Sequence, residues 1–123
     1  MKKHIIAVVL SMAVGLALSA EQVQTNPKAR VTKEEVAKGK VLIGKSDCFA
    51  CHKEKDKLVG PSYWEIAKRY PLTVANITLL AGKIIKGGSG AWGQIPMAPH
   101  PAITEVESKH MVTYILSVAG EKE

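Results

Sequence analysis

Cysteine occurs at two positions of this 123-residue chain, and both lie in the run Cys48-Phe49-Ala50-Cys51-His52. C-x-x-C-H is the attachment sequence for haem c. Two residues on a tight turn set the thiols as far apart as two vinyl groups on one porphyrin edge. The next residue then points beneath the macrocycle, where its imidazole can bind the iron. The motif predicts one haem c, attached through Cys48 and Cys51, with His52 as an axial ligand.

Two other uses of a C-x-x-C pair are possible. A redox-active disulfide of the thioredoxin type lies beside a βαβ pattern, and no such pattern is visible in this sequence. Zinc would require a second pair of Cys or His residues at suitable spacing, which is also missing. Haem is therefore the favoured interpretation.

The first twenty residues have the layout of a secretory signal. A basic start, Met1–His4, precedes an apolar run from Ile5 to Leu18 and small residues at the end. The run is about fourteen residues, shorter than the roughly 20 that cross a bilayer; the alternative is an uncleaved anchor. We expect a signal peptide over residues 1–20, export to the periplasm, and no stable membrane insertion after cleavage.

The exported part is poor in aromatic residues and mildly basic. One Phe, two Trp and three Tyr give little material for a core, and a large buried cofactor would supply the missing apolar volume. The formal charge of +6 falls to +4 without Lys2 and Lys3. Since no block of five like charges occurs, we expect no binding to nucleic acid.

Helix-start signals divide the rest of the chain. Residues 21–31 are polar and are expected to form a flexible lead-in, and residues 32–120 a single domain. Capping boxes begin at Thr32, Ser62 and Thr104, and Thr73 caps one further helix. Expected ends are near Gly44, Tyr70, Gly87 and Gly120. Buried faces are predicted for the last two helices at Val74, Ile77, Leu80, Ala81 and Ile84, and at Val106, His110, Met111, Tyr114, Ile115 and Val118.

A long segment rich in proline and glycine separates the last two helices. Residues 89–103 contain two glycines and three prolines, and we expect no regular element there. No alternating strand pattern is visible elsewhere, so the predicted class is all-α. A loop of this length in so small a domain is normally functional.

Four side chains are candidates for the second axial position of the iron: Met97, Met111, His100 and His110. Met111 falls on the apolar face of the last helix, where methionine usually packs, and His110 is expected at its boundary. Met97 is held between prolines in the long loop, from which a thioether can reach the iron. Core filling is the alternative for Met97, and ligation is the favoured interpretation.

Three motifs resemble a known family. Gly90–Pro99 closely resembles the methionine-ligand loop of small bacterial class I cytochromes c, and Val59–Tyr63 resembles the segment after their haem motif. With Cys48–His52, the likeness covers most of residues 33–119. It implies the class I cytochrome c fold, with three main helices and a short one around one haem, and His52 and Met97 as axial ligands.

The resemblance implies further roles. The carbonyl of Pro61 would accept the imidazole N–H of His52 and fix its orientation. Trp92 and Lys83 fall where the family places donors to a haem propionate; the alternative for Trp92 is core filling.

The crossing of the first and last helices and the residue after the methionine loop also follow from the resemblance. Gly39 would allow the two helices to approach closely, with Tyr114 facing it. The family often has an aromatic residue on the first helix at this crossing, which this chain lacks. His100 stands where the family often has an Asn that orients the ligand sulfur, and we expect its ring to donate in the same way; an exposed loop histidine is the alternative.

His/Met ligation leaves no open coordination position, which favours electron transfer over oxygen chemistry, and the thioether raises the potential. The expected function is that of a monomeric single-electron carrier, not an enzyme, in periplasmic respiratory or dehydrogenase electron transfer. Redox partner proteins would dock at the exposed haem edge near the cysteines, steered by lysines such as Lys53 and Lys57. The alternatives are a haem subunit dedicated to one dehydrogenase complex and a ligand-sensing or peroxidase-like protein.

Overall fold

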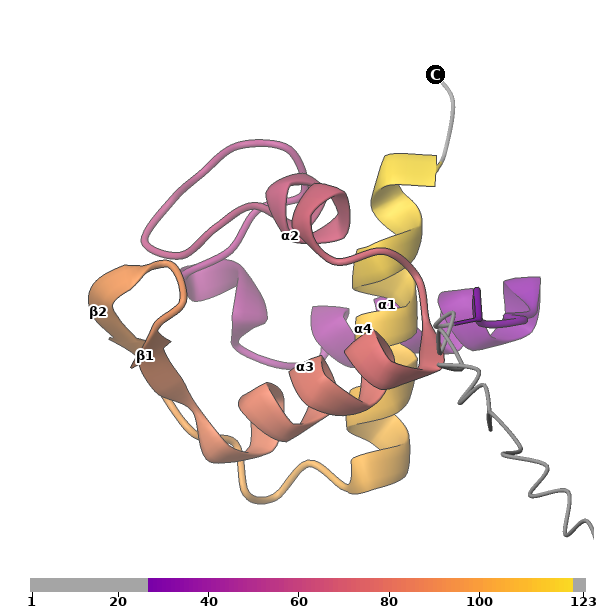
Figure 1. Cartoon of the computed structure of the whole chain (residues 1–123). Coiled ribbons are helices and arrows are strands. Elements are labelled where there is room, and N and C mark those ends of the chain that lie inside the picture. The colour runs from indigo at the N-terminus through magenta and orange to yellow at the C-terminus, as the bar shows by residue number, and fades with distance from the viewer. Residues whose placement is uncertain (1–26, 121–123) are drawn as a thin grey trace, which may run out of the picture.

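The computed structural model describes residues 27–120, so the expected signal peptide and most of the expected lead-in lie outside the described residues. Four α-helices form the framework of this part (Figure 1). No helix within residues 27–120 is long and apolar enough to cross a membrane. In chain order the elements are α1 (Lys33–Gly44), the 3₁₀ turn η1 (Cys48–Ala50), α2 (Tyr63–Arg69), α3 (Val74–Lys86), β1 (Gly88–Gly90), β2 (Gly93–Met97), α4 (Glu105–Ser117) and the 3₁₀ turn η2 (Val118–Gly120).

The predicted helix starts are confirmed. All three capping boxes form, and in each the N-cap hydroxyl accepts a hydrogen bond from the backbone N–H three residues later. Thr73 caps α3 in the same way, accepting from Asn76 N at 3.2 Å. Because these bonds satisfy amides that a helix leaves without partners, the sequence defines the helix starts closely.

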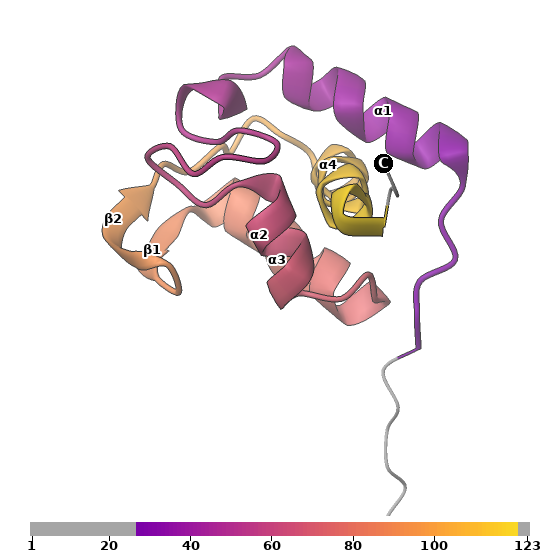
Figure 2. The ribbon, with the colours of Figure 1, turned by 90° about the horizontal axis from the view of Figure 1, so that it is seen from above.

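The crossing of α1 over α4 is the most extensive contact between helices. Figure 2 shows α1 lying across α4, which is seen almost end-on. Gly39 is buried at the crossing, and a Cβ added there would stand against the carbonyl oxygen of His110 and 2.9 Å from Tyr114 Cβ. The expected close approach at Gly39, with Tyr114 facing it, is confirmed.

The core gathers side chains from all four helices. Ile43 of α1, Tyr63 of α2 and Ala81 of α3 meet Met111 of α4, and each is at most 1 % exposed. Most of the predicted buried positions are confirmed, and Met111 packs in the core as expected. Two are wrong: Val74 is 59 % exposed and Val106 is 64 % exposed.

Position along the helix accounts for these two errors. Val106 lies in the first turn of α4, before the stretch from Met111 to Leu116 that is buried on every side. Val74 is the first residue of α3, at the end of the buried face. The cysteines and Met97 lie on the segments that connect these helices.

The segment after α3 is more regular than its sequence predicts. Instead of an irregular loop, residues 88–97 form a short antiparallel hairpin, with Gly88 opposite Met97 and Gly90 opposite Gly93. Gly88, Gly90 and Gly93 all have positive φ angles, which other residues adopt only at a cost. The glycines that argued against a regular element are therefore the residues that permit the tight hairpin.

Packing also begins earlier than expected at the N-terminal end. Ala29 is buried, its N–H donates to Leu72 O at 2.9 Å, and Lys28 pairs with Thr73. Residues 28 and 29, predicted as part of a flexible lead-in, thus lie against the start of α3, and Val31 packs partly buried against the core. The polar composition of residues 21–31 concealed this because the link to α3 is made by the backbone.

Candidate functional site

The two cysteines lie on a compact turn directly after α1. η1 spans Cys48–Ala50, and Cys48 O accepts from both Cys51 N at 3.2 Å and His52 N at 2.9 Å. Both thiols are free, with Cys48 half-buried and Cys51 exposed. The pair therefore forms no disulfide. Burial, and then the charge of Asp47, raise the pKa of the Cys48 thiol.

The ring of His52 is fixed from two sides. Its Nδ1 lies 2.7 Å from Pro61 O, and since a carbonyl can only accept, Nδ1 carries the proton. Gly60 lies against the ring, where a Cβ would come within 2.9 Å of Nδ1. The neutral imidazole is thereby left with a lone pair on Nε2, the arrangement that a metal-bound histidine requires.

Tyr63 packs against this histidine. Its ring stacks on His52 with 5.8 Å between centroids and lies 6.1 Å from that of Phe49. The side chain is 1 % exposed, yet its hydroxyl has no hydrogen-bond partner within the described part of the chain. Burial raises the pKa of this phenol, so it stays protonated. A buried phenol without a partner is unusual and indicates a polar group that completes the site.

Met97 ends strand β2 and packs partly buried against the core. The start of the hairpin is held close to it, since Gly87, at φ 66°, lies against the carbonyl of Met97 and a Cβ on it would stand 2.8 Å from Pro99 N. At the hairpin tip, Arg69 Nη1 donates to Ala91 O at 2.6 Å. The hairpin that ends at Met97 is therefore held at its tip by Arg69 and at its base by the close approach of Gly87.

Trp92 and Lys83, the two predicted propionate donors, do not fill the core. Trp92 is 40 % exposed and lies beneath the guanidinium of Arg69, which is 4.6 Å from the ring centroid. Lys83 is exposed, with its Nζ close to Gly88 of the hairpin. Sequence reasoning missed Arg69, because nothing in a lone arginine at the end of α2 indicates which loop it contacts.

His100 has a definite partner, contrary to the alternative of a solvated loop residue. Its Nε2 lies 2.9 Å from Asp47 Oδ1, and its Nδ1 is buried with no partner among residues 27–120. A carboxylate only accepts, so Nε2 carries the proton of the neutral ring. The ring N–H of His100, which was expected to orient the ligand sulfur, thus donates to Asp47. The sequence did not indicate Asp47 as its partner.

Large apolar side chains are exposed on the same segments. Phe49 lies within the cysteine-bearing turn, Val59 follows it in the chain, and Trp92 and Ile95 belong to the hairpin; each is at least 40 % exposed. A small domain seldom leaves so many large apolar groups in water around one site. A large apolar group bound between these segments would cover them.

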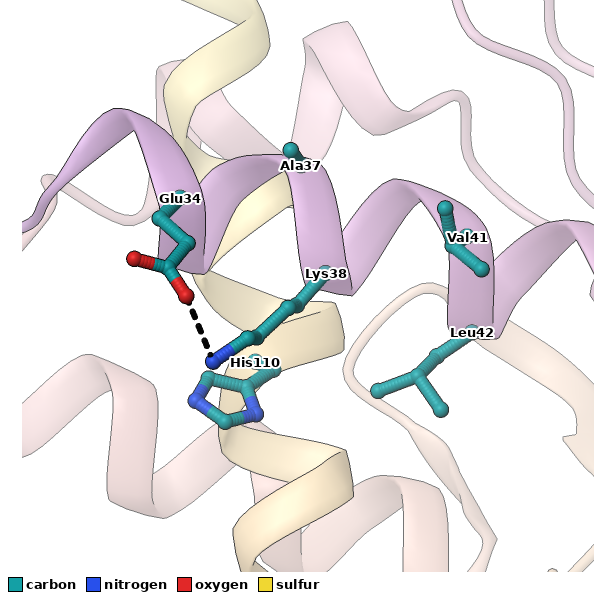
Figure 3. Close-up of a pocket in the computed structure, with 6 residues that line it drawn as sticks. All are labelled: Glu34, Ala37, Lys38, Val41, Leu42 and His110. Atoms are coloured by element: carbon teal, nitrogen blue, oxygen red, sulfur yellow. Dashed lines mark ion pairs between the residues drawn. The ribbon is translucent and has the colours of Figure 1, made fainter.

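A shallow pocket lies elsewhere, between α1 and His110 of α4 (Figure 3). It is lined by Ala37, Val41, Leu42 and His110, with an ion pair of 3.0 Å between Lys38 and Glu34 at one end. Of the side chains considered for the site, His110 lines it, and Cys48, Cys51, His52 and Met97 do not. Across residues 27–120 no three His, Cys, Asp or Glu side chains gather to hold a bare metal ion, so the zinc interpretation gains no support.

Comparison with known proteins identifies the family. Residues 36–119 match the family model described as Cytochrome c. This chain belongs to the cytochrome c family. It is 46 % identical over 77 residues to cytochrome c-552 of Hydrogenobacter thermophilus, covering 63 % of this chain and 78 % of that one. Cytochrome c-551 of Azotobacter vinelandii is 42 % identical over 79 residues, covering 64 % and 95 %.

A solved structure agrees. The crystal structure of Nitrosomonas europaea cytochrome c552 is 40 % identical, with a TM-score of 0.60, and covers 64 % of this chain and 98 % of that one. The class I cytochrome c fold predicted from the sequence is confirmed.

The family binds haem c covalently through two cysteines, which in this chain are Cys48 and Cys51. The described residues fit that group. Two free thiols stand on one turn, an imidazole beside them has its Nε2 lone pair available, and exposed apolar side chains surround them. As in its relatives, the haem serves electron transport.

Proposed function

We propose that this cytochrome c is a monomeric, periplasmic single-electron carrier whose haem iron is bound axially by His52 and Met97, in respiratory or dehydrogenase electron transfer. The observation that carries the proposal is the hydrogen bond from His52 Nδ1 to Pro61 O at 2.7 Å. It fixes the tautomer and orientation of a ligand imidazole and increases its basicity.

The place of Met97 supports a thioether ligand on the opposite side. It ends the hairpin that is attached to α2 through Arg69 and to the end of α3 through Gly87. The other methionine of the domain, Met111, is 1 % exposed in the helical core. When bound, a haem with imidazole and thioether ligands accepts and gives up one electron without an open coordination position.

Trp92 and Lys83 are proposed as donors to a haem propionate. Both lie on or beside the hairpin and both are exposed where a carboxylate could reach them. Arg69 stacks on Trp92 and would hold the indole in a fixed orientation while adding positive charge near the carboxylate.

Electrostatics supports docking of an acidic redox partner at the haem edge near the cysteines. Lys45, Lys53 and Lys57 are exposed on the segment around the C-x-x-C-H turn. Of the acidic residues that interrupt them, Glu54 accepts a hydrogen bond of 2.8 Å from Tyr114. Glu54 keeps its charge, so residues 45–57 carry a net charge of +1 from four lysines and three carboxylates, and this small excess would steer diffusional encounter more than it would add affinity.

Replacing each methionine with leucine tests the ligation. Leucine keeps the volume and removes the sulfur. In protein exported by a host that attaches haem c, Met97→Leu should abolish the methionine–iron charge-transfer band of the ferric protein. Its midpoint potential should fall by a sizeable part of the roughly 0.8 V over which axial ligands set haem potentials.

Met111→Leu is the matched control and should keep both the band and the potential. Carbon monoxide should bind ferrous Met97→Leu and leave the wild type unchanged. A wild type that binds carbon monoxide readily, or a band lost with Met111 instead of Met97, would refute the proposed ligation.

A further inference from the structure

A hydrogen bond joins two segments that are far apart in the sequence and that carry the two halves of the proposed haem site. Asp47 immediately precedes Cys48, and His100 follows Met97 by three residues. His100 Nε2 donates to Asp47 Oδ1 at 2.9 Å. We propose that these two residues form a clasp that holds the methionine-bearing segment, residues 88–103, against the cysteine-bearing turn.

Both sides of the clasp are anchored by the backbone. His100 N donates to Ile84 O and to Ile85 O, each at 3.1 Å, and His100 O accepts from Ile103 N at 3.1 Å. On the other side, Asp47 O accepts from Ala50 N at 3.0 Å within the cysteine-bearing turn. The link therefore connects the C-terminal end of α3 to the turn, rather than joining two mobile side chains.

Burial is unequal across the pair. The side chain of His100 is 21 % exposed and that of Asp47 is 76 % exposed. The clasp thus has a water-facing carboxylate and a mostly enclosed ring. Because the donor is the enclosed partner, loss of the carboxylate leaves a partly buried N–H without its acceptor, which is costlier than losing an exposed pair.

Stiff backbone would transmit the link to the sulfur. Pro99 and Pro101 flank His100, and each fixes its own φ angle and restricts the residue before it. Fixing His100 therefore restricts the chain back to Met97. The clasp acts as a positioning device that determines how readily another ligand displaces the thioether, an inference that rests on the proposed ligation by Met97.

Displacement of Met97 by added imidazole, measured in the ferric holoprotein, tests the clasp. Asp47→Ala and His100→Leu should each raise the apparent affinity for imidazole about tenfold, equivalent to about 1.4 kcal/mol. The double variant should show no more than the larger single effect, because each change breaks the same link. Asp47→Asn keeps an acceptor oxygen and should restore most of the wild-type resistance.

Asp56→Ala is the matched control for charge, since it removes an exposed carboxylate four residues after the motif. It should leave the imidazole affinity unchanged. Additive single effects, or an equal effect of Asp56→Ala, would overturn the clasp. His100→Leu leaves the cysteine-bearing turn intact, so the test stands even if Asp47→Ala impairs haem attachment.

Failure of the clasp and failure of the ligation are distinguishable. If Met97 is the ligand and the clasp acts on it, Asp47→Ala should have no effect on imidazole binding in a Met97→Leu background. If Met97→Leu keeps the charge-transfer band, the ligation proposal fails first. If that band is lost while Asp47→Ala and His100→Leu bind imidazole as the wild type does, only the clasp fails.

Discussion

The α1–α4 crossing and the methionine-bearing segment are held in place by different kinds of interaction. At the crossing, two helices touch through a buried glycine, and α4 buries every residue from Met111 to Leu116. In the methionine-bearing segment, both hairpin strands are exposed except at Met97. Polar links at Arg69 and His100 hold that segment in place. Figure 1 shows the hairpin on the side of the molecule away from α4.

This difference shows which region finds all of its packing partners within the polypeptide. The crossing has its packing partners within the chain. The segment with Trp92 and Ile95 leaves large apolar side chains in water, each worth about 1.5–3 kcal/mol when fully buried. A haem attached at Cys48 and Cys51 would cover such groups, so we expect the second region to depend on the cofactor more than the first.

The largest effect is expected from Gly39→Ala. A Cβ there would stand 2.7 Å from His110 C and closer still to the carbonyl oxygen, and backbone atoms cannot turn aside as a flexible side chain can. The two helices must separate, at a cost of about 3 kcal/mol. Chemical unfolding of the holoprotein should show this loss.

Gly82→Ala, in α3, is the control for the first prediction. A Cβ at Gly82 would meet nothing within 4 Å, so alanine should stabilise the helix by about 1 kcal/mol through its better helix propensity. Equal effects at the two glycines would mean that α1 and α4 are not in close contact at Gly39.

A smaller effect is expected in the other region, from Gly93→Ala at the hairpin turn. Gly93 has φ 117° with nothing within 4 Å of an added Cβ, so the cost is backbone strain alone, about 1 kcal/mol in an exposed turn that can relax. The loss should appear mainly as easier displacement of Met97 by imidazole and little as global unfolding. A global loss as large as that of Gly39→Ala would contradict the comparison.

The two regions also differ in how much of them the sequence predicts. The helices are marked by local signals, such as the capping box at Ser62, and their bounds agree with the structure. No local signal predicts the hairpin, because Gly90 and Gly93 indicate only that a helix or a regular strand does not continue through them. Whether the interruption is a loop or a tight hairpin depends on pairing across the turn.

The candidate site shows the same division. Spacing alone predicts Cys48, Cys51 and His52, since the chemistry of attachment dictates it. The partners of Asp47 and Arg69 lie 53 and 22 residues away, and no local pattern encodes such contacts. The roles of Met97, Trp92 and Lys83 remain predictions for the experiments above.

The smallest effect concerns the acid sensitivity of the helix caps in the helical region. Backbone and side-chain hydrogen bonds at the N-caps hold the pKa values of Glu35, Glu65 and Glu107 below the ordinary 4.5. The backbone N–H is the larger cause for Glu35 and Glu65, and the Thr104 hydroxyl for Glu107. Since the folded pKa values are the lower ones, their stabilisation is complete above the unfolded pKa and is lost as pH falls through the folded values.

Replacing these three glutamates by glutamine keeps the capping hydrogen bonds and removes the titration. The triple variant should therefore lose less stability than the wild type between pH 7 and pH 3, by urea unfolding of the holoprotein. Asp56→Asn, an exposed carboxylate outside any capping box, is the control and should leave the wild-type difference intact. The methionine-bearing segment contains no carboxylate of its own, and Asp47, the acceptor for His100, is unchanged in the triple variant, so the difference between the triple variant and the wild type reports the caps alone. If the methionine–iron band were lost in the wild type at pH 4 while the triple variant kept it, the caps would be coupled to the hairpin and the two regions would not be separate.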